Sequence, residues 1–215
     1  MHSGPFDPYE HLTCVLLPIN HDTSDASHDI SHLVRVSKNA KAIQSEEGGD
    51  LELLAAFVML HDCVQVPKDS ALRANASKVA ADKARSVLRG LKWDAARVGV
   101  VADAIESHSF SAGLIPVSLE GCVLQDADRL DAIGFIGIVR CFYTAGRLGS
   151  QLYDPLDPRG EARRLDDGRF ALDHFPRKLL NLAEGFQTST GQRLARDRHR
   201  AIQEFYEGVL VEVGA

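Results

Sequence analysis

The fold of this chain is decided at residues 50–62, which read DLELLAAFVMLHD. Asp50 stands where a carboxylate can cap a helix N-terminus. The run from Leu51 to Leu60 that follows is apolar on nearly every side, which is typical of a helix in the centre of a bundle. His61 and Asp62 end this run, where burial is expected. Burying such groups costs free energy unless something compensates them, and a bound metal ion is the simplest compensation.

Helical periodicity extends over almost the whole chain, and we find no convincing strand or hairpin pattern. Pro, Gly and cap residues, among them Ser77 and Asp94, divide the chain into expected helices over residues 9–17, 27–46, 51–60, 77–90, 94–108, 118–131, 134–147, 170–185 and 190–213. Pro176 is expected to bend or break the helix over residues 170–185. We therefore predict an all-α fold: a single compact domain over residues 1–215, with a core at about 25–145 and C-terminal helices at about 170–213 packing on it.

The composition narrows the class of protein. The chain has 215 residues, 45% of them hydrophobic and 25% charged, and its net charge of −6 disfavours a general nucleic-acid-binding surface. No apolar run approaches the length of a membrane span, and the N-terminus lacks a signal-peptide pattern. The four cysteines are scattered, which predicts free thiols in a reducing compartment. We expect a cytoplasmic protein with no membrane and no nucleic-acid partner; the oligomeric state stays open.

Histidines and carboxylates gather in three places along the predicted helices. His28 and His32 are four residues apart and share a helix face, so spacing alone allows either to be a ligand. Asp126 and Asp128 are two apart and cannot both point the same way from a regular helix. Mixed imidazole and carboxylate ligands favour Mn²⁺, Fe²⁺, Co²⁺ or Zn²⁺ over Ca²⁺. Spacing alone leaves a second interpretation equally open, in which these are hydrogen-bonded polar groups of the core.

Longer motifs surround these residues. They are His28-Asp29-x-x-His32-x-x-Arg35-Val36, Leu60-His61-Asp62 followed by Lys68, His108-Ser109-Phe110-Ser111, the run from Gln125 to Gly134, and Leu172-Asp173-His174-Phe175 followed by Lys178. Together they resemble the motifs of the HD superfamily of metal-dependent phosphohydrolases, and the last resembles a motif of its bacterial YedJ/YpgQ-like branch. The resemblance covers nearly the whole chain.

This resemblance implies an all-α HD-domain helical bundle that holds one divalent transition metal. The implied ligands are His32, His61, Asp62 and Asp128. His28 then lies nearby, and contact of His28 or Asp126 with the metal stays open. Manganese is the metal we expect first, with iron, cobalt, nickel, zinc and magnesium as alternatives. Four protein ligands would leave two octahedral positions for water and substrate, as in a catalytic site.

Departures from the family patterns narrow the implied reaction. Gln65 and Val66 replace the acidic residues that alarmone hydrolases and deoxynucleoside monophosphatases of the HD type carry after the His-Asp pair, and Ala132 replaces an Asn. The branch that remains is implied to cleave nucleoside triphosphates to monophosphate and pyrophosphate by a metal-activated water.

Several other residues are candidates for roles in that reaction. Arg35, Lys68 and Arg129 would offset the charge of the reacting phosphate, with solvated or ion-paired surface residues as the alternative. His108 would move a proton or hold water, with an interaction at the helix C-terminus as the alternative. His174 and Lys178, four apart, would join Lys68 in binding the substrate, with a helix surface pair as the alternative.

Two other classes of function remain open from the sequence. Some HD-fold proteins bind two irons and activate oxygen, and His28 and His108 could contribute to a second metal. A non-catalytic sensor of metal or nucleotide is the other class, although all four implied ligands are present.

Overall fold

The computed structural model describes residues 4–19, 30–64, 75–109 and 113–215. Helices dominate this part of the chain, and its only bridge between extended segments joins Gln151 to Phe170. The prediction of an all-α fold is confirmed.

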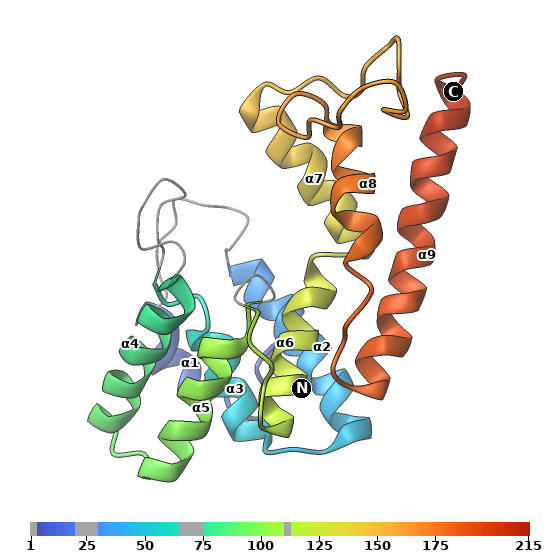
Figure 1. Ribbon diagram of the computed structural model, residues 1–215. Helices are drawn as coiled ribbons and strands as arrows, with labels where there is room; N and C mark the ends of the chain where they lie inside the picture. The colour runs from blue at the N-terminus through green and yellow to red at the C-terminus, as the bar shows by residue number, and fades with distance from the viewer. Residues whose placement is uncertain (1–3, 20–29, 65–74, 110–112) are drawn as a thin grey trace. The chain divides into compact units, whose positions relative to one another are not determined.

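Backbone contacts divide the chain into two compact units (Figure 1), residues 1–128 and residues 129–215. Each unit is described by itself. The single domain predicted from the sequence, with a core at about 25–145 and C-terminal helices at about 170–213, stays a prediction.

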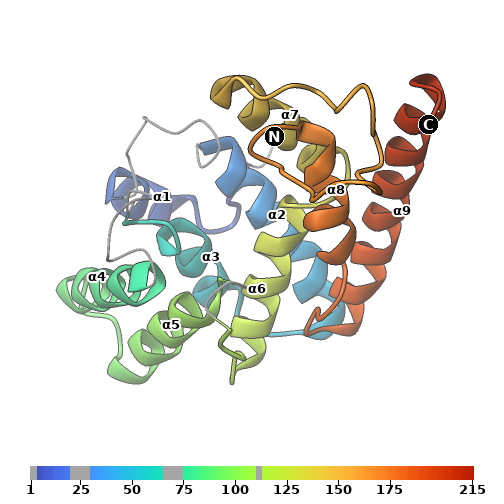
Figure 2. The same ribbon diagram turned by 45° about the horizontal axis from the view of Figure 1, so that its top comes forward.

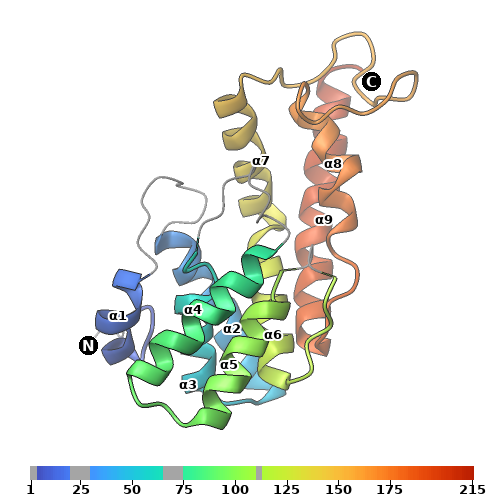
Figure 3. The same cartoon turned by 60° about the vertical axis from the view of Figure 1, so that its left-hand side comes forward.

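The first unit is built around one apolar helix. Its helices are α1 (Glu10–Leu16) with the 3-10 turn η1 (Leu17–Ile19), α2 (Ile30–Glu47), α3 (Leu51–Leu60), α4 (Ala76–Gly90), α5 (Ala95–Ser107) and α6 (Leu119–Asp131), whose last residues belong to the second unit. Helix α3 contacts α1, α2 and α5, and α4 runs beside α5 (Figures 1 and 3). The predicted start of α2, at Ser27 or His28, lies outside the described residues.

Helix α3 occupies the central position that its composition predicts. Seven of its side chains are buried, namely Leu53, Leu54, Ala56, Phe57, Val58, Met59 and Leu60. Gly48 and Gly49 have φ of 86° and 102°, values that favour glycine, and they turn the chain from α2 into α3. Asp50 Oδ1 then accepts hydrogen bonds from the N–H groups of Glu52 (2.9 Å) and Leu53 (3.1 Å), so the predicted cap is confirmed.

One predicted cap is confirmed and another is wrong. Asp94 Oδ1 accepts from Ala96 N at 2.9 Å and Arg97 N at 3.2 Å at the start of α5. Ser77, however, lies inside α4, whose N-cap is Asn75 without a side-chain cap hydrogen bond. Asn75 and Ser77 are both cap-type residues, and the pattern alone did not distinguish between them.

The second unit pairs two long helices, α7 (Gly134–Leu148) and α9 (Ser189–Glu212), which pack against each other (Figure 2). Three short helices lie between them in sequence: η5 (Ala171–Asp173), α8 (His174–Arg177) and η6 (Leu179–Asn181). Aromatic rings join α7, α8 and α9. The Phe175 ring of α8 lies 6.0 Å from the Phe142 ring of α7, and it stacks on Phe205 (5.7 Å between centroids) and Tyr206 (5.5 Å) of α9.

The segment expected as a helix over residues 170–185, bent or broken at Pro176, is broken, but its break lies elsewhere and helical structure ends at Asn181. The chain leaves helical geometry at Lys178 (φ −139°, ψ −60°), two residues after Pro176, instead of bending at the proline itself. The carbonyls of Leu182, Glu184 and Gly185 accept hydrogen bonds from the Arg129 guanidinium instead of taking part in a helix. A contact this distant in sequence is invisible to local periodicity.

Residues 150–169 are irregular, as expected, and a buried carboxylate organises them. Asp173 is 1% exposed and accepts from Arg163 Nη1 (2.6 Å), Arg163 Nη2 (2.9 Å) and Asp166 N (2.6 Å). Arg163 also lies 3.0 Å from Asp154 Oδ2. Asp173, part of the C-terminal motif, therefore holds this loop.

Candidate metal centre

The site begins at the C-terminal end of α3. His61 caps the helix, is 1% exposed, and its Nδ1 lies 2.9 Å from the Val58 carbonyl oxygen. A carbonyl can only accept a hydrogen bond, so Nδ1 is the donor, which leaves Nε2 as the ring nitrogen available to a metal. The end of α3 thus holds the His61 imidazole in the tautomer that can bind a metal through Nε2.

Two other elements of the first unit bring their side chains to His61 Nε2. His32, near the start of α2 and 1% exposed, places its Nε2 3.3 Å away. Asp128 of α6 places Oδ1 3.5 Å from His32 Nε2 and 3.9 Å from His61 Nε2. Asn39 of α2 donates to the Ala127 carbonyl of α6 at 3.0 Å, which ties the two ligand-bearing helices together.

Asp62 joins this group from the turn after α3. Its Oδ2 lies 3.4 Å from His61 Nε2 and 3.7 Å from His32 Nε2, and the side chain is 28% exposed. We call His32, His61, Asp62 and Asp128 the ligand cluster. Adjacent residues on a regular helix point about 100° apart. Because α3 ends at Leu60, His61 and Asp62 lie at and beyond the helix end, where both side chains can reach one point.

The ligand cluster fits a divalent metal ion. The ligand atoms of His32, His61 and Asp128 all lie within 4.8 Å of one another. Donors bonded to one ion at about 2.0–2.2 Å are roughly 3–3.5 Å apart, which is close to the observed separations. Two imidazole nitrogens 3.3 Å apart, one with its lone pair facing the other, are stabilised when a cation lies between them.

His108 stands beside the ligand cluster and uses the same arrangement as His61. It caps α5, and its Nδ1 lies 2.6 Å from the Ile105 carbonyl oxygen, which leaves Nε2 4.0 Å from Asp62 Oδ1. Burial, followed by the neighbouring His61, lowers the pKa of His108. Gln125 donates to the Ser107 carbonyl at 2.8 Å and supports this helix end, a contact that we did not anticipate from the motif that contains it.

The predicted cationic residues are placed differently from one another. Arg35 is half-buried on α2, three residues after His32, and its Nη1 donates to Ser31 Oγ at 2.8 Å. Lys68 and His28 lie outside the described residues. Arg129 belongs to the second unit and is 5% exposed; its guanidinium donates to three carbonyls and lies 4.5 Å from the Phe186 ring centroid. These contacts give Arg129 a structural role, and its catalytic role stays a prediction.

His174 and Lys178 also belong to the second unit. His174 Nδ1 lies 2.8 Å from Asp167 Oδ2, and Arg177 Nη1 lies 2.7 Å from Asp167 Oδ1. Burial alone would raise the pKa of Asp167, but these two partners hold it below its ordinary value. Lys178 is exposed. A substrate-binding role for both residues stays a prediction.

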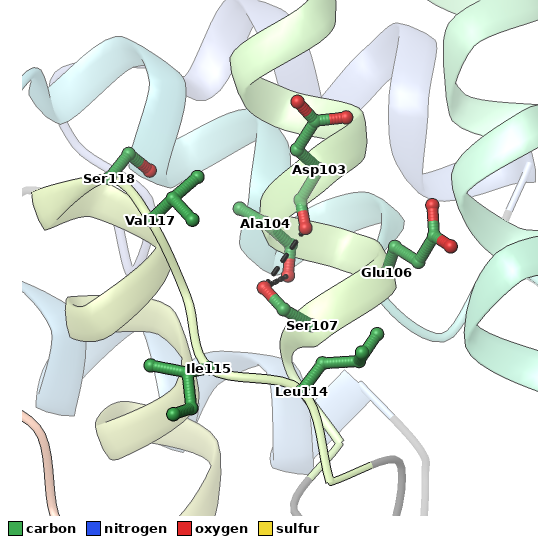
Figure 4. A pocket seen from close by; sticks show the side chains of 8 residues that line it. All are labelled: Asp103, Ala104, Glu106, Ser107, Leu114, Ile115, Val117 and Ser118. Atoms are coloured by element: carbon green, nitrogen blue, oxygen red, sulfur yellow. Dashed lines mark hydrogen bonds between the residues drawn. The ribbon is translucent and has the colours of Figure 1, made fainter.

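A hollow of about 210 Å³ opens beside the C-terminal half of α5, between this helix and the loop that leads to α6 (Figure 4). Its lining residues are Asp103, Ala104, Glu106, Ser107, Leu114, Ile115, Val117 and Ser118. None of the ligand cluster is among them, so we assign the hollow no part in the metal centre.

Two further observations concern the cysteine thiols and the possibility of a membrane span. All four cysteines are free, as expected, and burial raises the pKa of Cys63 and of Cys141 to about 11. Among the described residues, none of the helices is both long and apolar enough to cross a membrane.

Comparison with known proteins gives a consistent set of relatives. A family described as the HD domain matches residues 29–133. YpgQ of Bacillus subtilis is 35% identical over 185 residues, which cover 84% of this chain and 82% of YpgQ. The crystal structure of an HD-superfamily hydrolase from Bacillus thuringiensis is similar with a TM-score of 0.71, at 30% identity over 96% of this chain and 98% of that one. The crystal structure of Bacillus subtilis YpgQ in complex with ADP also gives a TM-score of 0.71, at 27% identity over 98% and 97% of the two chains.

Proposed function

Because this chain belongs to the HD family of hydrolases, we propose that it cleaves nucleoside triphosphates to monophosphates and pyrophosphate. The observation that carries the proposal is the convergence of two imidazoles and two carboxylates in the ligand cluster. The ADP bound to YpgQ, a relative of similar fold, supports a nucleotide as the substrate.

His32, His61, Asp62 and Asp128 would hold one divalent transition metal, with manganese as our first choice. Such an ion supplies Lewis acidity, lowering the pKa of water and offsetting charge on phosphate oxygens. The protein's part is to present the four side chains at one point. The hydrogen bond from His61 Nδ1 to the Val58 carbonyl maintains the tautomer that binding requires.

The remaining assignments follow from position. Release of pyrophosphate requires water to attack the α-phosphorus while the bond from that phosphorus to the bridging oxygen breaks. His108 Nε2, beside Asp62, is the group that we assign to hold the attacking water or exchange its proton. Arg35 lies one helical turn from His32, and we assign its guanidinium, with Lys68, to the phosphate oxygens.

The test measures metal content and products together. The wild-type protein, supplied in turn with Mn²⁺, Co²⁺ and Mg²⁺, is incubated with each nucleoside triphosphate, and phosphate and pyrophosphate are resolved. We expect pyrophosphate from the wild type, and loss of both bound metal and turnover in Asp62→Ala. Asp197→Ala, which changes an aspartate whose side chain is 61% exposed, is the matched control and should behave as the wild type.

Unchanged metal content and turnover in Asp62→Ala would overturn the proposal. Phosphate in place of pyrophosphate would move the cleaved bond to the terminal phosphate and refute the proposed products. Two irons per chain would favour the oxygenase class, and stoichiometric metal binding with no turnover of any nucleotide would favour a sensor.

A further inference from the structure

Lys83 of α4 reaches the main chain next to the ligand cluster. Its Nζ lies 2.7 Å from the Cys63 carbonyl oxygen and 3.2 Å from the Ile19 carbonyl oxygen. Cys63 directly follows the His61-Asp62 pair. A charged donor at 2.7 Å makes a stronger hydrogen bond than a neutral one, so the ammonium restrains this carbonyl.

The turn that carries Asp62 is held from α4 at two points. Besides the Lys83 contact, Cys63 is 5% exposed and its Sγ lies 3.6 Å from the Ala80 carbonyl oxygen, also on α4. The Cys63 N–H donates to the Leu60 carbonyl at 3.0 Å, which closes the turn onto the end of α3. Beyond a helix end, carbonyls have no intrahelical partner, and Lys83 supplies one here.

We propose that Lys83 is a positioning residue for the metal centre, acting through the Cys63 carbonyl to hold Asp62 in place. The inference rests on the proposed metal site, because Asp62 matters to the ligand cluster only if a cation binds there. Asp62 Oδ2 lies within 3.7 Å of both imidazole nitrogens. A small movement of the turn would therefore change the distance between this ligand and the other three.

The sign of the effect separates positioning from simple electrostatics. Lys83 carries a positive charge, and a positive charge close to a cation site weakens cation binding. If charge alone mattered, removing it would tighten metal binding. If Lys83 positions Asp62, removing it weakens metal binding, by about 10–100-fold as for other residues that support metal ligands from behind.

The experiment compares Lys83→Met with Lys83→Gln, which lacks the charge but keeps an N–H donor. Mn²⁺ affinity is measured by calorimetry, and the Co²⁺ absorption spectrum reports ligand geometry. We expect about 10–100-fold weaker Mn²⁺ binding and an altered Co²⁺ spectrum in Lys83→Met, with partial recovery of both in Lys83→Gln. Lys78→Met changes an exposed lysine of the same helix and should match the wild type.

The controls keep the two proposals distinguishable. If His61→Ala retains wild-type Mn²⁺ affinity, the metal site itself is wrong. If His61→Ala loses affinity while Lys83→Met binds Mn²⁺ as tightly as the wild type or more tightly, the metal site stands and the role of Lys83 is refuted. Thermal unfolding shows whether each variant folds. If Lys83→Met does not fold, Lys83→Gln decides: weaker binding with an altered spectrum supports positioning, and unchanged or tighter binding refutes it.

Discussion

Replacement of Asp50 by Ala should destabilise the protein by about 2 kcal/mol. Asp50 Oδ1 accepts from two N–H groups at the start of α3, and loss of such a cap costs about 1 kcal/mol. Asp50 Oδ2 lies 2.6 Å from Arg97 Nη1, and both side chains are about one-third exposed. An ion pair with this exposure contributes about 0.5–1 kcal/mol after solvent screening. For a chain of this size, the sum corresponds to a fall in Tm of roughly 4–8 °C.

Two variants divide this loss into its parts. Asp50→Asn keeps an oxygen that can cap the helix and loses the charge, so it should lose only about 0.5–1 kcal/mol. Asp94→Ala removes the matched cap of α5 and should lose about 1 kcal/mol. The free energy of unfolding is measured by urea titration followed by circular dichroism. Equal losses in Asp50→Asn and Asp50→Ala would show that capping is not the source of the stabilisation.

The pH dependence of the Asp50→Ala effect follows from the pKa. Burial alone would raise the pKa of Asp50, but the hydrogen bonds from Arg97 and from the N–H groups of α3 lower it below 3.8. A carboxyl with a lowered pKa in the folded state stabilises that state above its unfolded pKa and loses this effect as pH falls. The difference between the wild type and Asp50→Ala should therefore be full at neutral pH and shrink below about pH 4.

Two further predictions concern the second unit. Burial and then Asp167 raise the pKa of Cys141 from 9.0 to about 11, so the folded state disfavours the thiolate and loses stability as pH rises from 9 toward 11. The difference in unfolding free energy between the wild type and Cys141→Ala should shrink over that range, and a constant difference would contradict the prediction. Arg129→Met should lower the free energy of unfolding by about 2 kcal/mol, because the Leu182 and Glu184 carbonyls lose their donor, while the Gly185 carbonyl keeps Gln187 Nε2 at 3.1 Å. Urea unfolding checks this, and wild-type stability in Arg129→Met would show that these contacts are dispensable.

The features of the fold that the sequence predicted correctly depend on interactions between residues close together in sequence. Asp50 and Asp94 lie where a carboxylate meets the first N–H groups of a helix, an interaction that spans only two or three residues. The apolar run before His61 predicted a central helix because it is apolar on nearly every side. Prediction from the local sequence failed between residues 170 and 185, where Arg129, distant in sequence, donates hydrogen bonds to main-chain carbonyls.

The candidate site also contains residues that the sequence predicted and one that it could not predict. The motifs predicted that His32, His61, Asp62 and Asp128 would converge, and the structure brings these side chains together. Lys83 could not be anticipated, because it contacts main-chain carbonyls that every residue possesses and no side-chain pattern records such a contact. Arg129 shows another case, since its place in a motif suggested chemistry, and the structure shows its guanidinium donating to three main-chain carbonyls; its catalytic role stays a prediction.

Two of the three histidines around Asp62 lie at helix ends and share one hydrogen-bonding arrangement. His61 ends α3 and His108 ends α5, and each directs Nδ1 to the carbonyl three residues earlier. The last carbonyls of a helix have no partner within the helix, so this contact satisfies the backbone and fixes the tautomer at once. With Nδ1 bonded in this way at each helix end, Nε2 of His61 lies 3.4 Å and Nε2 of His108 lies 4.0 Å from a carboxylate oxygen of Asp62. The cap at Asp50 sets where α3 begins relative to the end that carries His61.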